Sequence, residues 1–251
     1  MRAKSKIIAI VAIFLIILGT GTNIFALGDG IIIENHKNQS KIIDVPYTSQ
    51  TDIVFGCEAV SSTMLLNYYG YKIDKKEFTD QYLIQKDWYV DEDGIIYGPD
   101  PNSAYVGNPY IDGGVNCGFG CFANATAKSI DLVLEKDHRT KVTTGMNLAD
   151  LVYNYIDQDI PVLVWATMDM KQSYLSMTWT INYADADSPY KVGDQYTWVA
   201  GEHCLVLVGY DEENYYFNDP YKNHGLIKYN KELVAQRFLE LGKQSLVVLP
   251  R

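Results

Sequence analysis

The sequence predicts an α+β fold in which helices come first and an antiparallel sheet follows. Residues 58–69 carry apolar side chains three and four positions apart, which is typical of a helix, and Gly70 is placed to end it. After Ile160 the pattern changes to short apolar runs separated by Asn, Asp and Gly. Such runs indicate strands joined by tight turns. Helices followed by strands favour the α+β class.

The first 26 residues have the layout of a signal peptide. Basic residues near Met1 precede an apolar run, Ile7–Leu18, and small residues with Ala26 follow. The run is shorter than the roughly 20 residues that a membrane span needs. We therefore expect cleavage after Ala26 and a secreted protein. If the apolar region is counted on to Leu27, an uncleaved N-terminal anchor is the alternative, which would leave the protein on the cell surface.

The rest of the chain is interpreted as a linker and one domain. Residues 27–41 show no sustained hydrophobic period and are assigned to the linker, and residues 42–251 to the domain. Asp74 is placed to cap a second helix that runs to about residue 85. Further helices are expected over residues 122–136 and 148–157.

A Gly- and Tyr-rich insertion separates these helices at residues 86–120. It holds seven glycines and three prolines, and it shows no regular period. Irregular segments of this length inside a compact domain are usually functional. We expect the insertion to shape a substrate groove or, if the protein is not an enzyme, a recognition surface.

Seven segments of the second half are expected to be strands. The longest are continuous apolar runs, and turn residues such as Asp211–Asn214 separate them. The expected strands are residues 161–167, 175–183, 198–200, 203–210, 215–217, 226–229 and 246–249.

The composition excludes several classes of protein. Hydrophobic residues make up 47% and charged residues 21% of the chain, which is ordinary for a globular protein and excludes a disordered chain or a polytopic membrane protein. The net charge of −10 leaves no basic excess for phosphate contacts, so we expect no nucleic-acid partner. We also expect no cofactor, and a monomer.

Cys57 is the candidate nucleophile, because it directly precedes the strongest predicted helix. A thiol at a helix N-terminus lies at the positive end of the helix dipole, which favours the reactive thiolate. The alternatives are a small buried residue or one half of a disulfide. Cys117 and Cys121 could form a local disulfide or stay free, and we expect free thiols, whereas Cys204 is expected to be a buried packing residue. Their spacing does not match the CxxC pairs of zinc sites, and no metal is expected.

His203 and Asp219 are the candidate partners of the thiol. His203 opens the best predicted strand, and Asp219 follows the next strand in the segment Phe217–Pro220. An acceptor there could bond one ring nitrogen and leave the other as a base. Taken alone, His203 could face solvent and Asp219 could serve only its turn. A Cys near the mature N-terminus with a His about 130–150 residues later is the papain-like pattern.

Four more residues are assigned to the site. Gln50 lies in the loop before Cys57, where its amide and the Cys57 backbone N–H could form an oxyanion hole. A solvated loop residue is the alternative. The candidate substrate-binding residues are Gly56, Trp198 and Gly201, of which Trp198 lies close before His203. The other tryptophans are expected in the core.

These segments together resemble the C39-like peptidase family of the papain-like superfamily. The matching stretches are Val45–Gln50, Gly56–Ser61, Met64–Gly70, Gly201–Asp211 and Asn218–Pro220. The resemblance covers about residues 42–250. It implies a papain-like fold with Cys57 on the helical half and His203 on the sheet half. It further implies Cys57 as nucleophile, His203 as general base, Asp219 as orienting carboxylate and Gln50 as oxyanion donor.

We therefore expect a secreted or surface cysteine peptidase acting on a peptide or protein through an acyl-thioester. The relatives that cut bacteriocin leader peptides are fused to transporter domains, which this sequence does not show, so that activity is not carried over. Two alternatives stay open. The enzyme could be a cell-wall peptide amidase or an acyltransferase of the same fold, or the chain could be a non-catalytic secreted binding module.

Overall fold

The computed structural model describes residues 22–27, 30–35 and 40–251, which fall into two units. In the first unit β1 (Thr22–Leu27) pairs antiparallel with β2 (Gly30–Asn35). Most of the expected signal peptide and parts of the expected linker lie outside the described residues. Among those that are described, no helix combines the length and the apolar character needed to cross a bilayer.

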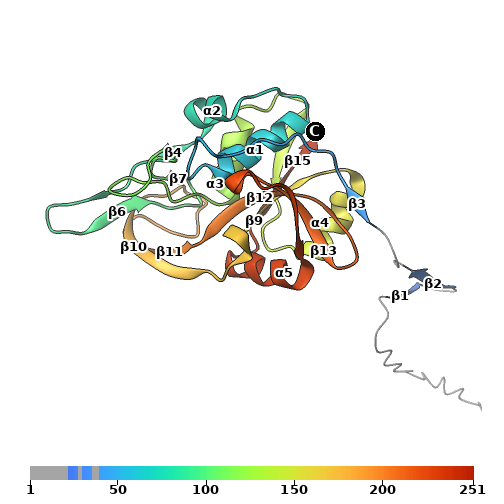
Figure 1. Ribbon diagram of the computed structural model, residues 1–251. Coiled ribbons are helices and arrows are strands. Elements are labelled where there is room, and N and C mark those ends of the chain that lie inside the picture. The colour runs from blue at the N-terminus through green and yellow to red at the C-terminus, as the bar shows by residue number, and fades with distance from the viewer. Residues whose placement is uncertain (1–21, 28–29, 36–39) are drawn as a thin grey trace, which may run out of the picture. The chain divides into compact units, whose positions relative to one another are not determined.

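A seven-stranded sheet is the centre of the second unit (Figure 1). Its strand order is β14-β13-β12-β9-β15-β8, and every neighbouring pair is antiparallel. The short strand β3 (Lys41–Ile42) adds to β12. The bounds are β8 (His138–Val142), β9 (Val162–Thr167), β12 (Glu202–Tyr210), β13 (Asn214–Asp219), β14 (Gly225–Asn230) and β15 (Ser245–Pro250).

Helices cover both faces of this sheet. Helix α1 (Cys57–Tyr68) packs against β12 and β9, and α5 (Lys231–Glu240) lies on the opposite side in Figure 1. Helix α3 (Ala123–Asp131) contacts α1, β8 and β15. The first ten residues of α1 are all buried, because α3 and residues 75–82 pack on the helix beside the sheet. The expected arrangement, a helical half followed by an antiparallel sheet, is confirmed.

A second sheet forms around the insertion. Its order is β11-β10-β6-β5, with β10 and β6 parallel. Two of its strands come from the insertion and two from the second half, and a two-stranded pair, β4 and β7, lies beside them. The bounds are β4 (Gln85–Lys86), β5 (Tyr89–Val90), β6 (Ile96–Pro99), β7 (Tyr105–Val106), β10 (Tyr174–Tyr183) and β11 (Gln195–Ala200).

Three expectations about helices differ from the structure. The helix after Asp74 is a single turn, α2 (Lys75–Glu77), followed by a π turn over Phe78–Tyr82, although Asp74 does cap it by accepting from the Lys76 backbone N–H at 2.8 Å. Helix α3 ends at Asp131, before the expected end. Helix α4 (Leu148–Asn154) gives way to a 3₁₀ turn.

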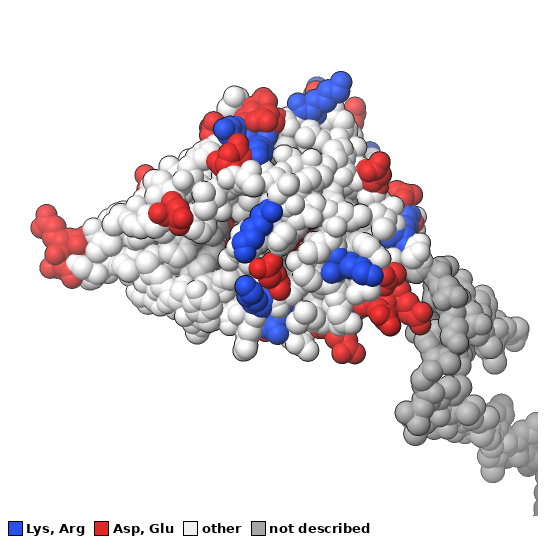
Figure 2. All heavy atoms as spheres, viewed as in Figure 1, with Lys and Arg blue, Asp and Glu red and all other residues white. Residues whose placement is uncertain are grey.

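Charged side chains are scattered over the face shown in Figure 2. Acidic side chains gather at the tip of the β5–β6 extension, where Asp91, Glu92 and Asp93 form the turn. Asp91 accepts backbone N–H bonds from Asp93 and Ile95 there, which is ordinary turn chemistry. Between this tip and the Lys and Arg side chains, most of the surface shown in Figure 2 carries no charged side chain.

Candidate active site

The loop before α1 holds Cys57 at the start of the helix through a set of backbone bonds. The Gly56 N–H donates to the Ile53 carbonyl at 2.9 Å, and the Ile53 N–H donates to the Gln50 carbonyl at 2.8 Å. The Tyr105 hydroxyl donates to the Phe55 carbonyl at 2.7 Å. Each bond fixes the loop against a buried neighbour, so the position of the thiol is set before any substrate binds.

The same loop is attached to the histidine side of the site. The Gln50 backbone N–H donates to the Pro220 carbonyl at 3.0 Å, and Pro220 directly follows Asp219. This bond links the loop that carries the cysteine with the loop that carries the aspartate. The two halves of the domain are therefore joined at the site itself.

His203 and Asp219 form a buried hydrogen-bonded pair. The distance from His203 Nε2 to Asp219 Oδ1 is 2.7 Å, and both side chains are almost fully buried. Burial opposes ionisation of Asp219, but hydrogen bonds from His203, the Tyr221 backbone N–H and His224 outweigh it and hold the Asp219 pKa below its ordinary value. The His203 ring also packs edge-to-face on the Tyr221 ring, with centroids 5.8 Å apart.

One pocket of about 520 Å³ contains the predicted nucleophile, base and amide. The remaining lining is largely aromatic and apolar, and none of it is Lys or Arg. Its lining residues are Gln50, Val54, Phe55, Cys57, Asp112, Gly113, Cys117, Gly118, Phe119, Met168, Tyr174, Ser176, Trp198, Ala200, Gly201, Glu202, His203 and Tyr221. Residues 112–119 belong to the insertion, which thus forms one wall of the pocket.

The Cys57 thiol faces a carboxyl group in this structure. Its Sγ donates to Glu58 Oε2 at 3.2 Å. Burial raises the pKa of Cys57 well above its ordinary value, and Glu58 and Glu202 raise it further. The sequence-based expectation of a favoured thiolate is therefore not met by the resting arrangement, because loss of solvation and two acidic neighbours outweigh the helix dipole.

The predicted oxyanion and groove residues have different surroundings. Gln50 is buried; its Nε2 donates to the Val54 carbonyl at 3.1 Å, and its Oε1 has no hydrogen-bond partner within residues 40–251. Gly201 lines the pocket in a left-handed conformation with φ of 84°. Trp198 also lines it, but is only 4% exposed and stacks on Phe122 with centroids 5.8 Å apart.

Gly56 does not line the pocket, contrary to its assignment as a substrate-binding residue. A Cβ at this position would lie 2.4 Å from Ile53 Cγ2. The absence of a side chain at Gly56 is explained by the tight turn that leads into α1. Its role is to bring the loop close to Ile53, which in turn positions Cys57.

The sequence reasoning missed three residues of the site. His224 Nδ1 lies 3.2 Å from Asp219 Oδ2, so both oxygens of that carboxylate are occupied. Tyr221 covers His203, and Glu202 lines the pocket beside it. The signals were present in the sequence: two of these residues follow Asp219 within one turn, and Glu202 directly precedes His203.

The four cysteines are free thiols in the described part of the chain, as expected for Cys117 and Cys121, and Cys204 is buried as expected. Cys57, Glu58 and Glu202 have donor atoms within 4.8 Å of one another, the one such group among the residues described. A cation there would require an ionised thiol and ionised carboxyls. Burial disfavours all three ionised forms when no ion is bound.

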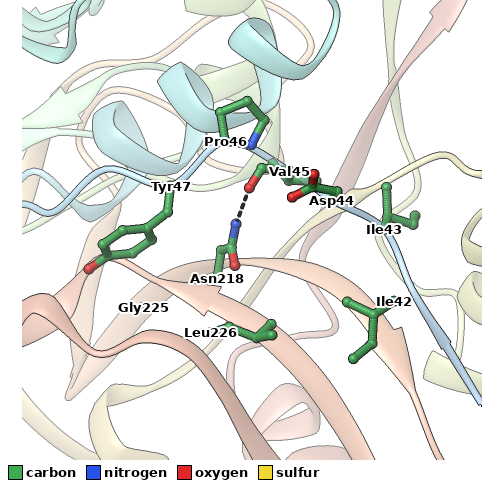
Figure 3. A pocket seen from close by; sticks show the side chains of 9 residues that line it. All are labelled: Ile42, Ile43, Asp44, Val45, Pro46, Tyr47, Asn218, Gly225 and Leu226. Atoms are coloured by element: carbon green, nitrogen blue, oxygen red, sulfur yellow. Dashed lines mark hydrogen bonds between the residues drawn. The ribbon is translucent and has the colours of Figure 1, made fainter.

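A second hollow, of about 400 Å³, lies away from the thiol (Figure 3). It is bounded by residues 42–47 on one side and by β13 and β14 on the other. Asn218 Nδ2 donates to the Val45 carbonyl across it at 2.8 Å. No nucleophile lines this hollow, and its bond ties the start of the domain to the strand that ends in Asp219.

Known proteins resemble this chain in sequence and in fold. The chain is 26% identical over 219 residues to the uncharacterized protein YvpB of Bacillus subtilis (strain 168), covering 84% of this chain and 77% of that protein. A crystal structure assigned to a C39-like peptidase from Bacillus anthracis superposes with a TM-score of 0.70 at 24% identity, covering 85% of this chain and 98% of that one. That structure supports the fold.

A double glycine motif protease from an AMS/PCAT transporter, solved with its leader peptide, is more distant. The TM-score is 0.39 at 15% identity, with 84% of this chain and 95% of that chain covered, and we draw nothing from it. The model of the Peptidase_C39 like family matches residues 42–246, nearly all of the second unit. By this match the chain belongs to the C39-like peptidase family.

Proposed function

We propose that this chain is a cysteine peptidase that hydrolyses an amide bond through an acyl-thioester on Cys57. The observation that carries the proposal is a single pocket lined by a cysteine at a helix N-terminus and by His203, whose ring is hydrogen-bonded to the buried Asp219 behind it. A nucleophile and a base in one cavity, with a carboxylate that orients the base, are the parts that acyl transfer requires.

The hydrogen bonds assign the proton positions on His203. Asp219 is ionised, because its pKa is lowered, so it accepts from Nε2. Nδ1 is then the unprotonated nitrogen, and it has no hydrogen-bond partner among residues 40–251. In the proposed reaction Nδ1 takes the proton from the Cys57 thiol, the sulfur attacks the carbonyl carbon, and the imidazolium returns the proton to the leaving amine. Water then hydrolyses the thioester.

The developing oxyanion would be stabilised by Gln50 and the Cys57 backbone N–H. Gln50 Nε2 uses one of its two N–H groups on the Val54 carbonyl, which holds the amide in place and leaves the second N–H for the oxyanion. A donor fixed in advance lowers the energy of the transition state without reorganisation. Gln50 is therefore proposed as an oxyanion donor.

The pocket lining favours a peptide with an apolar side chain and without negative charge near the cut bond. Tyr174 and Trp198 supply aromatic surface, whereas Asp112 and Glu202 are the acidic residues of the lining. Since no basic side chain lines the pocket, a carboxylate on the substrate would lie near like charge. The signal-peptide pattern of the first 26 residues supports action outside the cell, on an exported peptide or protein.

A peptide library tests the proposal directly. Purified residues 40–251 are incubated with a mixture of unmodified peptides and with cell-wall peptide fragments, and the products are identified by mass spectrometry. Wild type should cut peptides, and Cys57→Ser should cut none while keeping its circular dichroism spectrum. Cys117→Ser is the matched control, since Cys117 is a free thiol in the same pocket but has no histidine partner, and it should retain activity.

The products also separate the alternative functions. Cleavage restricted to cell-wall fragments would assign an amidase, and amine adducts in place of free acids would assign an acyltransferase. Equal hydrolysis by wild type and Cys57→Ser would contradict the proposal. So would the absence of any product together with tight retention of a peptide, which would favour a binding module.

A further inference from the structure

Two buried carboxyl groups flank the Cys57 thiol, one from each half of the domain. Glu58 follows Cys57 on α1, and Glu202 begins β12 directly before His203. The sulfur and one oxygen of each carboxyl lie within 4.8 Å of one another. Glu58 is fully buried and Glu202 is 6% exposed. Neither residue has a part in the reaction described above.

In the described part of the chain, no positive charge near the pair balances two ionised carboxyls. Glu58 accepts from the backbone N–H groups of Cys121, at 2.6 Å, and of Glu58 itself, and Glu58 Oε2 accepts from the thiol. Glu202 Oε1 is buried and has no hydrogen-bond partner among the residues that the structure describes. Within residues 40–251 no Lys, Arg or His contributes to the charge balance of either carboxyl. Two unpaired carboxylates this close and this dry are unstable, so at least one must keep a proton.

Gly120 shows how closely the two carboxyls converge. A Cβ at Gly120 would lie 2.6 Å from Glu58 Oε1 and 2.7 Å from Glu202 Oε2. The residue has φ of 149°, a conformation that favours glycine. Any side chain here would collide with both carboxyls. The insertion therefore passes over the two carboxyls at a glycine, which leaves room for both of them.

The other groups that face the pair are neutral near pH 7. They are thiols and phenols whose pKa values burial raises, and the two carboxyls raise the pKa of each thiol and of Tyr105 further. They come from α1, β7, the turn before α3, β11 and β12: Cys57, Tyr105, Cys121, Tyr196 and Cys204. The proton balance of the site is thus decided by the carboxyls.

We propose that Glu58 and Glu202 are positioning residues that hold one proton between them, on Glu202, and that the charge remaining on Glu58 keeps the resting Cys57 thiol protonated and directed at Glu58. This rests on the proposed function of Cys57 as nucleophile and describes its regulation. Forming the reactive thiolate moves one proton from sulfur to His203 Nδ1. That transfer meets less repulsion when the pair has taken up a second proton, on Glu58, so mild acid favours it.

The pH dependence of Cys57 alkylation tests the proposal without any substrate. The purified protein is treated with iodoacetamide from pH 5 to 10, and the rate at Cys57 is followed by peptide mass spectrometry. In wild type the logarithm of the rate should rise with a slope below one, because the thiol becomes harder to ionise as Glu58 loses its proton. Glu58→Gln should give a single titration shifted to lower pH, with a rate at pH 8 about tenfold higher.

Glu202→Gln distinguishes a shared proton from two independent charges. Since Glu202 carries the proton, its amide should shift the profile much less than Glu58→Gln does. Glu77→Gln, an exposed charge on α2, is the matched control and should change nothing. Unchanged reactivity in Glu58→Gln, or equal shifts in Glu58→Gln and Glu202→Gln, would overturn the proposal. So would a stoichiometric metal ion in the purified protein, since a cation would then balance the charge.

Infrared difference spectra keep the test independent of folding in the variants. Wild-type protein labelled with ¹³C-glutamate should show a protonated buried carboxyl at pH 8 and a second one appearing below about pH 7. Absence of any protonated carboxyl at pH 8 would overturn the shared proton. If Cys57 proves not to be the nucleophile, wild type and Cys57→Ser give the same result in the library assay, while these spectra and the alkylation shift persist, so the two failures are distinguishable.

Discussion

The site contains two buried clusters whose carboxyl groups have opposite pKa shifts. One is His203–Asp219 and the other is Cys57–Glu58–Glu202. Asp219 has three donors, from His203, Tyr221 and His224, and its pKa is lowered despite burial. On the other side, burial raises the pKa of Glu58 to about 7 and the pKa of Glu202 well above its ordinary value. Burial alone therefore does not decide the charge state of a carboxyl in this site. Asp219 has two histidine partners, whereas Glu58 accepts only from backbone N–H groups and a thiol.

The two clusters have different roles in the proposed reaction. The Asp219 carboxylate stays ionised and orients the base, His203. Glu58 and Glu202 can hold protons, and Glu58 lies against the Cys57 thiol, whose deprotonation starts the proposed reaction. The following experiments change one cluster at a time.

Asp219→Asn should have the largest effect, a fall in kcat of roughly 10²–10⁴ with little change in KM. The amide can donate to His203 Nε2 and thereby moves the proton to Nδ1, where the base is needed. The measurement is steady-state hydrolysis of the best library peptide. A loss below fivefold would mean that Asp219 does not set the tautomer, and the contrast between the clusters would lose its first half.

The same variant has a stability signature. Because the pKa of Asp219 is lowered, its stabilising contribution is present above the unfolded-state pKa of about 3.9 and is lost as pH falls through the folded-state pKa. Wild type should therefore lose stability to urea as pH falls below 4 more steeply than Asp219→Asn. Parallel stability curves would contradict the assignment of an ionised Asp219.

Gln50→Ala is expected to lower kcat by roughly 10²–10³ while KM stays within a few-fold, since the second amide N–H acts only on the oxyanion. Gln50→Glu, which keeps the shape but replaces the donor with an acceptor, should lower it at least as far. The two variants are compared by kcat and KM on one peptide. A change confined to KM would make Gln50 a substrate-binding residue.

Glu58→Gln should change stability with the opposite pH dependence. A carboxyl with a raised pKa contributes its full stability below the unfolded-state pKa of about 4.3, and this is lost as pH rises through the folded value of about 7. Relative to wild type, Glu58→Gln should therefore gain about 3–4 kcal/mol in the free energy of unfolding between pH 4 and pH 8. Urea unfolding at both values measures this, with Glu77→Gln as the flat control. A constant difference would contradict the raised pKa.

The smallest effect is expected at the rim of the pocket. Tyr174 is 66% exposed and lines the opening. Tyr174→Ala should raise KM by roughly threefold to tenfold for peptides with an apolar side chain, because it removes about 1 kcal/mol of contact, and should leave kcat unchanged. The comparison uses one peptide and its variant with Ser at the apolar position. Equal effects on both peptides would place the apolar subsite elsewhere.

Much of the architecture could be predicted from the sequence. Six of the seven expected strands lie where continuous apolar runs end at turn residues, and the seventh, over 198–200, proved to be the end of β11. Helix α5 and the strands β1–β8 were not predicted, and the insertion that was expected to be irregular contains β5, β6 and β7. β8 is an edge strand whose residues are mostly exposed or half-buried, so it carries no apolar run, and α5 has only two fully buried side chains. Their positions depend on tertiary packing rather than on local pattern.

The site was predictable in its members but not in its charge state. The cysteine, histidine and aspartate could be chosen from type and spacing, and one pocket contains the first two, with the third bonded to the histidine. The neighbourhood of Glu58 and Glu202 could not, because these residues are 144 positions apart and meet only across the interface of α1 and β12. The pKa of Cys57 is raised by burial and, in addition, by the two carboxyls that this interface brings to the thiol.

Trapping of the acyl-enzyme tests the central claim most directly. A p-nitrophenyl ester of an apolar N-acetyl amino acid is mixed with wild type, His203→Gln and Cys57→Ser, the reactions are quenched in acid, and intact mass and peptide mapping locate the acyl group. We predict one acyl group on Cys57 in wild type, far slower acylation in His203→Gln and none in Cys57→Ser. Equal acylation of Cys117, or acylation that persists in Cys57→Ser, would contradict the assignment of Cys57 as the nucleophile.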